Sequence, residues 1–310
     1  MTRNPLLGVG LVLLAASLWG TLGTVYTLTI DGYGLTPLVV VFYRALFGAA
    51  AIGLLLLVGR RELLWVPPAG RRLVTAYGLL GVTVFYVAYI YAILLVGVTT
   101  AVVLLYTAPA IVAVLAWRFL GESLTRRKLL ALALTFAGVI LVSGAYNPAQ
   151  LGGNLLGIGC GLLAGATYAL YSIFGKMAQA QSVPLPTLLF YTLAIGSIGL
   201  LTTILFTAPV TLLTPAAHPA SWAVLAMLGT VQTLTPIAAY TLSLRHLDAA
   251  AASVCATLEP VVAGALAVVV LHQPLGAPSI AGAVLVLLAA TVVGTASHRP
   301  DIAPGRAPVV

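Results

Sequence analysis

Charge is what this sequence has least of. Asp, Glu, Lys and Arg together make up 6% of its 310 residues, and only six residues are acidic. A soluble domain carries about 25% charged residues. Hydrophobic residues reach 61% and the mean hydropathy is +1.13. This composition excludes an ordinary soluble protein and indicates a polytopic membrane protein.

Cysteine and histidine are also scarce, with two and four residues respectively. Cys160 and Cys255 fall inside apolar runs, where a cysteine is usually a small packing residue. The histidines are scattered, so we expect no metal site and no cofactor. His246 and Asp248 have no catalytic partner set in any apolar run, which argues against an intramembrane enzyme. We therefore expect that the chain is not an enzyme.

Apolar runs about 20 residues long, the length that crosses a bilayer, follow one another along the chain. They predict an all-α membrane protein with ten transmembrane helices. The first run is long and lacks a small-residue cleavage site, so we interpret it as a retained span. Residues 299–310 are interpreted as a disordered cytoplasmic tail. The predicted spans are 6–29, 36–58, 73–96, 100–120, 127–145, 153–177, 186–207, 221–244, 250–271 and 277–297.

The distribution of Lys and Arg predicts the orientation of these spans, because cytoplasmic loops carry the positive charge. With both termini in the cytoplasm, 13 of the 14 basic residues lie on the cytoplasmic side. The exception is Arg44, inside the second span. The net charge of +8 is therefore interpreted as membrane anchoring, not as a nucleic-acid surface. The expected location is the plasma (bacterial inner) membrane. The basic residues placed inside are Arg3, Arg60, Arg61, Arg71, Arg72, Arg118, Arg126, Arg127, Lys128, Lys176, Arg245, Arg299 and Arg306.

The pattern of residues 105–142 recurs at 257–294, about half a chain length later. A period this long indicates duplication of a whole helical module, with the halves at 1–150 and 151–298. Since each half has an odd number of predicted spans, the halves insert with opposite orientation. Inverted repeats usually enclose a substrate site near the membrane midplane and work by alternating access. Three pairs keep a spacing of 151 residues: Pro109 and Pro260, Glu122 and Gln273, and Tyr89 and Tyr240.

Several motifs resemble those of a known family. Leu18-Trp19-Gly20, Arg44, Pro109, residues 121–125 (GESLT) and Gly138-Val139 lie in the first half, and Tyr168-Ala169, Lys176 and Glu259-Pro260 in the second. They are similar to paired EamA domains of the drug/metabolite transporter superfamily. The resemblance implies a metabolite exporter, with amino acids as the commonest cargo. Size and the Tyr-rich core resemble the aromatic amino acid exporter subgroup (YddG type). Gln273 departs from the family's usual Glu.

Aromatic and polar side chains inside the spans are candidates for a substrate site, because lipid does not tolerate unsatisfied polar groups. Aromatic walls with a few hydroxyls suit an amphipathic solute such as a large neutral amino acid. The alternative for Tyr is an interface anchor, and for Thr a bond to the carbonyl one turn back. The candidates are Trp19, Tyr86, Tyr89, Tyr106, Tyr168, Tyr171, Gln232, Tyr240, Thr257 and Glu259.

Prolines and charges inside apolar runs complete the candidates. Pro109, Pro236 and Pro260 each remove a backbone hydrogen bond and are interpreted as hinges or static bends. Glu259 is a proton-coupling or amine-binding candidate, or a structural hydrogen-bond partner. We favour a structural role for Arg44 over snorkelling outward, binding a substrate carboxylate or pairing with Glu259. Glu122 is expected to cap a helix or pair with Arg126.

The leading hypothesis is a secondary transporter that exports small amphipathic metabolites, most plausibly aromatic or large neutral amino acids. A multidrug or other metabolite carrier of the same superfamily is the alternative. A nucleotide-sugar or phosphorylated-sugar antiporter needs several cationic side chains in its cavity, and Arg44 is the one candidate inside a predicted span. The partners expected are a small solute and the lipid bilayer, with the protein itself a monomer.

Overall fold

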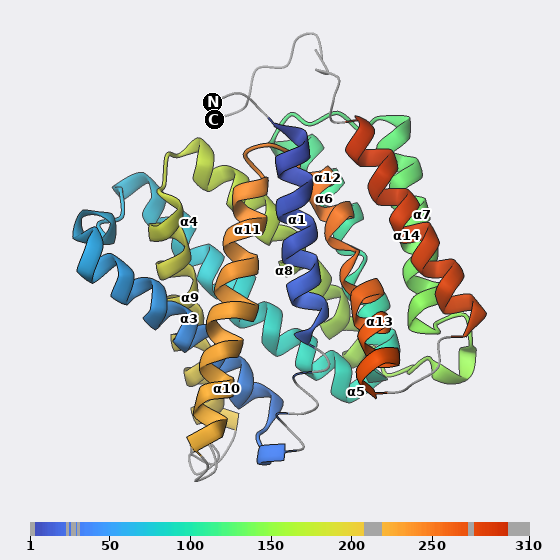
Figure 1. Cartoon of the computed structure of the whole chain (residues 1–310), viewed down its shortest axis with the longest axis horizontal. Coiled ribbons are helices and arrows are strands. Elements are labelled where there is room, and N and C mark those ends of the chain that lie inside the picture. The colour runs from blue at the N-terminus through green and yellow to red at the C-terminus, as the bar shows by residue number, and fades with distance from the viewer. Residues whose placement is uncertain are drawn as a thin grey trace.

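The computed structural model of the chain is a bundle of α-helices (Figure 1). It describes residues 4–22, 25, 29, 32–207, 219–271 and 276–296, and no strand occurs among them. The predicted all-α fold is confirmed for this part of the chain. Gln273 and the predicted tail at 299–310 lie outside the described residues. The helices are α1 Pro5–Gly20, α3 Pro37–Gly59, α4 Pro68–Gly78, α5 Phe85–Leu105, α6 Ala108–Phe119, α7 Arg126–Ser143, α8 Leu155–Ala180, α9 Leu185–Thr207, α10 Pro219–Gly229, α11 Thr235–Ser243, α12 Ala249–Ala256, α13 Glu259–Leu271 and α14 Ala277–Ala296.

Local sequence explains where several helices begin. Proline occupies the first position of α1, α3, α4 and α10, where its missing N–H has no helical partner to lose. Asn4, Thr125 and Asn154 cap α1, α7 and α8 by accepting hydrogen bonds from backbone N–H groups at 3.1–3.3 Å. These residues therefore set the start of each helix before any packing is considered.

Six helical segments of the described chain are long and apolar enough to cross a membrane. Three further apolar helices are shorter: Pro5–Gly20, Ala108–Phe119 and Ala277–Val292. The predicted spans 100–120 and 250–271 are both interrupted, because α5 ends at Leu105 and α6 starts at Ala108, while α12 ends at Ala256 and α13 starts at Glu259. Gly97, with φ of +77°, interrupts the helical backbone of α5 between the third and fourth predicted spans, since glycine tolerates this backbone region.

Irregular turns recur in the two halves of the chain at the same 151-residue spacing. A π-helical turn at Leu79–Val84 is matched by one at Thr230–Leu234. The helix break at 106–107 is matched by a break at 257–258, each followed by a helix with proline in second place. Irregular backbone inside an apolar bundle needs polar or tightly packed neighbours, and π-helical turns are frequent at functional sites. The matched turns and breaks are therefore where we look for a candidate site.

The packing of the helices also repeats when the halves are exchanged. α3 packs on α9 and α7 on α14, while α8 packs on α5 and α6 as α1 does on α11 and α13. Gly78 and Gly229, 151 residues apart, each admit the backbone of a neighbouring helix. A Cβ on Gly78 would lie 3.0 Å from the Thr192 carbonyl oxygen, and one on Gly229 would lie 2.9 Å from that of Arg44.

The contact between α7 and α14 gives a first prediction. A Cβ on Gly282 would lie 2.6 Å from the carbonyl oxygen of Gly138, so Gly282→Val must push the two helices apart. We expect a loss of about 1–3 kcal/mol, measured as a lower melting temperature in detergent. Gly159→Val is the matched control, because nothing lies within 4 Å of that position on α8. Equal melting temperatures for the two variants would contradict the close contact.

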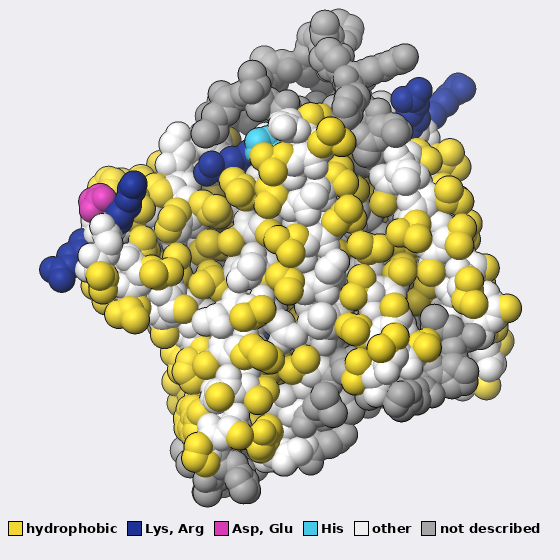
Figure 2. Space-filling model, viewed as in Figure 1, with side chains coloured by type: hydrophobic (Ala, Val, Ile, Leu, Met, Phe, Trp, Pro, Cys, Tyr) yellow, Lys and Arg dark blue, Asp and Glu magenta, His cyan; other side chains and the backbone are white. Residues whose placement is uncertain are grey.

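One end of the bundle carries the charge. The start of α1 and the end of α14 lie at the same end (Figure 1). On the face drawn in Figure 2, the Lys and Arg side chains lie toward that end, while hydrophobic side chains are spread over the rest of the described surface. Arg60, Arg61, Arg71 and Arg72 are exposed around the connection between α3 and α4. We call this end the basic end.

Candidate functional site

Glu259 stands at the break between α12 and α13, as the first residue of α13. It is half-buried, and its carboxyl group lies beside the hydroxyl of Tyr106. Tyr106 occupies the matching break between α5 and α6. The two halves thus each contribute an interrupted helix, and the interruptions meet at a carboxyl group in the middle of an apolar bundle.

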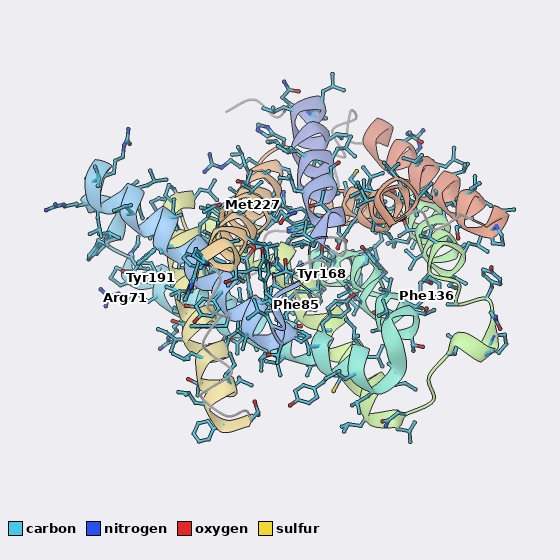
Figure 3. The ribbon with its side chains drawn as sticks, turned by 60° about the horizontal axis from the view of Figure 1, so that its bottom comes forward. Arg71, Phe85, Phe136, Tyr168, Tyr191 and Met227 are labelled. Atoms are coloured by element: carbon cyan, nitrogen blue, oxygen red, sulfur yellow. The ribbon has the colours of Figure 1, made fainter. Side chains whose placement is uncertain are left out.

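An aromatic cluster surrounds this carboxyl group. Phe85 stacks on Tyr168 with ring centroids 5.4 Å apart and an angle of 24° between the ring planes. Phe85 also contacts Tyr86 at 4.8 Å and Tyr89 at 6.1 Å. Figure 3 shows Phe85 and Tyr168 close together near the centre of the molecule. All four side chains are half-buried, and two of them, Tyr89 and Tyr168, lie close enough to Glu259 to interact with its charge.

Trp19 extends the cluster from α1. Its ring lies 6.5 Å from that of Tyr168 in an edge-to-face arrangement and 5.7 Å from that of Tyr240. The predicted site residues Tyr171 and Tyr240 lie on the far side of Trp19, where they are buried. Tyr240 shares a 2.7 Å hydrogen bond with Ser172. The sequence analysis treated all these tyrosines as one site. In the structure Tyr168 is half-buried, whereas Tyr171 and Tyr240 are buried.

Arg44 is buried, with 3% of its surface exposed, so the alternative of snorkelling outward is wrong. Its Nε donates to the hydroxyl of Thr233 at 2.9 Å, and a second nitrogen donates to Tyr86 at 3.4 Å. The guanidinium carbon also lies 5.4 Å from the Tyr86 ring centroid. These contacts tie α3 to the π-helical turn at 230–234 and fix the position of Tyr86.

Gln232, in the same π-helical turn, holds an unused acceptor. Its Nε2 donates to the Thr21 hydroxyl at 2.6 Å, and that hydroxyl donates its proton to the Leu18 carbonyl at 2.7 Å. Because the hydroxyl has only one proton, turning the amide around would leave no donor for its oxygen. Gln232 is 6% exposed, and its Oε1 has no hydrogen-bond partner. A ligand N–H or O–H group would satisfy it.

The remaining candidates have local roles. Thr257, at the break before α13, donates its hydroxyl to the Val254 carbonyl at 2.6 Å, which is the local alternative considered above. Pro109 and Pro260 are the second residues of α6 and α13, and Pro236 is the second residue of α11. Pro109 and Pro260 therefore start helices after a break, whereas Pro236 follows a π-helical turn inside the continuous helical run Pro219–Ser243.

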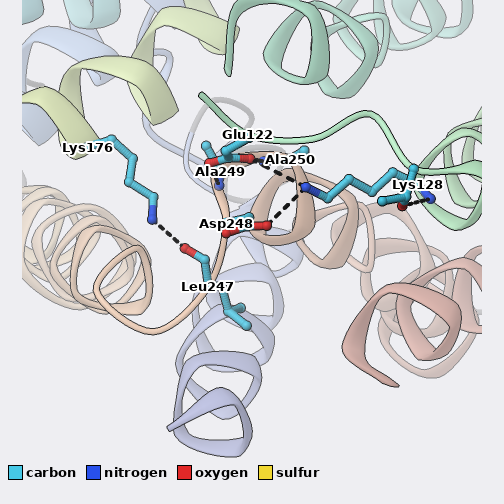
Figure 4. A network of polar contacts seen from close by, with 8 residues as sticks. Glu122, Lys128, Lys176, Leu247, Asp248, Ala249 and Ala250 are labelled. Atoms are coloured by element: carbon cyan, nitrogen blue, oxygen red, sulfur yellow. Dashed lines mark hydrogen bonds and ion pairs between the residues drawn. The ribbon is translucent and has the colours of Figure 1, made fainter. Parts of the chain in front are cut away.

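A polar network links the two halves of the chain at the basic end of the bundle (Figure 4). Glu122 accepts hydrogen bonds from the Ala249 N–H at 2.7 Å and the Ala250 N–H at 3.4 Å, and so caps α12 in the other half. Lys128 Nζ lies 2.9 Å from Asp248 and 3.8 Å from Glu122, in the place expected for Arg126. Lys176 donates to the Leu247 carbonyl at 2.6 Å. We call Glu122, Lys128, Lys176, Leu247 and Asp248 the clasp.

The clasp holds charges in a poorly solvated place. Burial, and next the neighbouring Asp248 carboxylate, raise the pKa of Glu122, while the Ala249 N–H and the Lys176 and Lys128 cations oppose this.

The sequence analysis did not identify two residues of the aromatic cluster and the clasp, Phe85 and Lys128. Phe85 had a signal, since it lies 151 residues before Pro236. Nothing in the run Arg126-Arg127-Lys128 distinguishes Lys128, which is buried while the two arginines are exposed.

Among the described residues, no three His, Cys, Asp or Glu side chains lie close enough together to hold a metal ion. The site therefore offers one carboxyl group, one amide and a wall of aromatic rings. Interrupted helices that present polar groups inside an apolar bundle are typical of secondary transporters. Fold and site together define the class: a multi-pass membrane carrier.

The chain belongs to the EamA-like transporter family. The sequence pattern of that family matches it twice, at residues 6–144 and 155–295. The protein is therefore a membrane transporter of the drug/metabolite transporter superfamily. The predicted family and membrane class are both confirmed.

Relatives agree with this assignment. An uncharacterized transporter of Archaeoglobus fulgidus is 29% identical over 286 residues, which cover 90% of this chain and 93% of the relative. A second uncharacterized transporter of the same organism is 26% identical over 261 residues, covering 84% and 89%. A protein of known crystal structure shares the fold with a TM-score of 0.79 at 17% identity, over 95% of this chain and 98% of that one.

Proposed function

We propose that this transporter exports small amphipathic metabolites, chiefly aromatic or large neutral amino acids, across the plasma (bacterial inner) membrane by alternating access. The observation that carries the proposal is the Glu259 carboxyl group, which lies near Tyr106, Tyr89 and Tyr168, with Phe85 stacked on Tyr168. A carboxylate attracts a substrate ammonium group, and the rings suit an apolar side chain. Gln232 Oε1 supplies a second acceptor for a donor on the substrate.

We further propose ten transmembrane helices in two inverted five-helix halves, 1–150 and 151–298, with both termini in the cytoplasm. The matched π-helical turns, the matched breaks and the exchange-symmetric packing support this arrangement. The gathering of basic side chains at the end where α1 starts and α14 ends supports a cytoplasmic basic end. Rocking one half against the other would then expose the site to each side in turn.

A phosphorylated-sugar or nucleotide-sugar antiporter is less well supported. Phosphate groups need several cations around them. Near Glu259, Arg44 is already engaged with Thr233 and Tyr86, and Lys128 and Lys176 are bonded within the clasp. Multidrug transport or carriage of another amphipathic metabolite is compatible with the same aromatic wall and is the second candidate. We continue to expect that the protein is not an enzyme and works as a monomer.

Counterflow in liposomes tests the cargo. We expect labelled phenylalanine, threonine or methionine to exchange through the wild-type protein and labelled phosphorylated sugars not to exchange. Gln232→Leu should raise the substrate KM about 10-fold, because one hydrogen bond to a charged group contributes about 1.5 kcal/mol. Gln181→Leu is the control, since Gln181 is exposed at the end of α8. Exchange of a phosphorylated sugar without any amino acid would overturn the proposal.

A further inference from the structure

Three hydroxyl groups are buried together without hydrogen bonds. They belong to Tyr77 on α4, Tyr171 on α8 and Thr241 on α11, which are 1%, 6% and 2% exposed. The Tyr77 hydroxyl lies beside those of Tyr171 and Thr241, yet none of the three is placed to form a hydrogen bond. Native proteins rarely leave buried polar groups in this state unless another partner or another conformation satisfies them.

The positions of these three residues along their helices locate the cluster relative to the Glu259 site and the clasp. On α8, Tyr168 lines the Glu259 site, Tyr171 follows three residues later, and Lys176 reaches the clasp five residues after that. At 1.5 Å per residue, Tyr171 is about 4.5 Å from Tyr168 along the axis and Lys176 about 12 Å. On α11, Thr241 is nine residues beyond Gln232, about 13 Å in the same direction. The cluster therefore lies between the site and the clasp.

A continuous run of aromatic rings joins the site to the cluster. Tyr168 contacts Trp19, Trp19 contacts Tyr240 at 5.7 Å, and Tyr240 contacts Tyr171 at 6.1 Å. Tyr171 in turn meets Tyr77 edge to face at 4.8 Å. An amphipathic solute leaving Glu259 toward the clasp would keep an apolar wall along the whole way and would meet the three hydroxyls next.

We propose that Tyr77, Tyr171 and Thr241 form a second, transient binding station for the polar end of the transported solute. This inference rests on the proposed function, which makes the Glu259 site the first station. In the present conformation the clasp bonds the two halves together at the basic end, and the hydroxyls have no hydrogen-bond partner. When the clasp opens, the ammonium or carboxylate group of the solute replaces the missing hydrogen bonds.

Removal of each hydroxyl tests the station, because the present structure gives these groups no structural hydrogen bond to lose. In Tyr171→Phe and Thr241→Val, we expect the counterflow rate to fall at least fivefold. The dissociation constant for substrate, read from the fluorescence of Trp19 in a background where the other three tryptophans are replaced by phenylalanine, should stay within twofold, since the first station is intact. Melting temperatures should be unchanged or higher, as expected when an unpartnered buried hydroxyl is removed. Thr241→Ser, which keeps the hydroxyl, should restore the rate.

Thr135 provides the matched control. Its hydroxyl is also buried and unpartnered, but it lies on α7, outside the cluster. Thr135→Val should change the melting temperature in the same sense and leave the counterflow rate at the wild-type value. Wild-type rates in Tyr171→Phe and Thr241→Val would overturn the station and assign the hydroxyls to a buried water. Loss of rate together with loss of substrate affinity or stability would also overturn it. A wild-type protein that exchanges no amphipathic solute overturns the proposed function, and the station with it.

Discussion

Glu259→Gln should lower the counterflow rate about 10- to 100-fold while leaving the protein folded. The carboxylate is the one acidic group that the described structure places among the central aromatic rings. A charge at the centre of a bilayer costs about 2.5–3.5 kcal/mol, so a substrate cation that compensates it gains in binding. A hydrogen bond to a charged group contributes about 1.5–3 kcal/mol, and its loss gives the stated range of rates.

The amide of the variant has nearly the same shape as the carboxyl group and can still accept a hydrogen bond through its oxygen, so the local structure is kept. We therefore expect the melting temperature of Glu259→Gln to equal or exceed that of the wild type. Glu62→Gln is the matched control, because Glu62 is exposed in the turn Arg61–Leu64 at the basic end. Counterflow of labelled phenylalanine is the measurement. A rate in Glu259→Gln within twofold of wild type would remove the carboxylate from the transport site.

Lys128→Met is the second large effect we expect, and it concerns the clasp. The substitution keeps the length of the side chain but leaves Glu122 and Asp248 facing each other without the shared cation. Breaking a buried ion pair from one side costs about 3–5 kcal/mol, and the 30% exposure of the Asp248 side chain places the expected loss at the lower end. We expect a lower melting temperature and an opened basic end.

Opening can be measured with a cysteine at position 241 in a variant that lacks Cys160 and Cys255. A charged thiol reagent added from the clasp side should label it faster when Lys128→Met is present. Arg127→Met is the matched control, because Arg127 is exposed on the same first turn of α7. Equal labelling rates and melting temperatures in the two variants would show that the clasp does not hold this end shut.

The raised pKa of Glu122 adds a pH dependence to this end of the protein. A carboxyl group whose pKa is higher in the folded state binds its proton more tightly there than in the unfolded chain. Its contribution to stability is therefore fully present below the unfolded pKa of about 4.3 and is lost as pH rises through the folded value. Glu122→Gln should remove this part of the pH dependence.

Membrane character and internal duplication could be predicted from the sequence, because both depend on the order of residues along the chain and not on how the helices pack. Apolar runs about as long as a bilayer is thick indicate spans, and a 151-residue repeat of Pro109 and Pro260 indicates a duplicated module. The same spacing correctly related the two helix breaks, although it did not reveal that 106–107 is a break. Glu259 and the tyrosines around it could be found because polar groups are rare in such runs.

Which of these polar groups meet was decided by the tertiary structure alone. α1 and α9 are apolar on every face, so their sequences carry no signal for the side that turns inward. The depth and rotation of each helix come from close contacts such as that of Gly78 with the backbone of α9. Those contacts separate Tyr168 from Tyr171 and bury Lys128 beside two exposed arginines. They also join Glu122 to a helix more than 120 residues away, because side chains from distant segments meet only after the helices have packed.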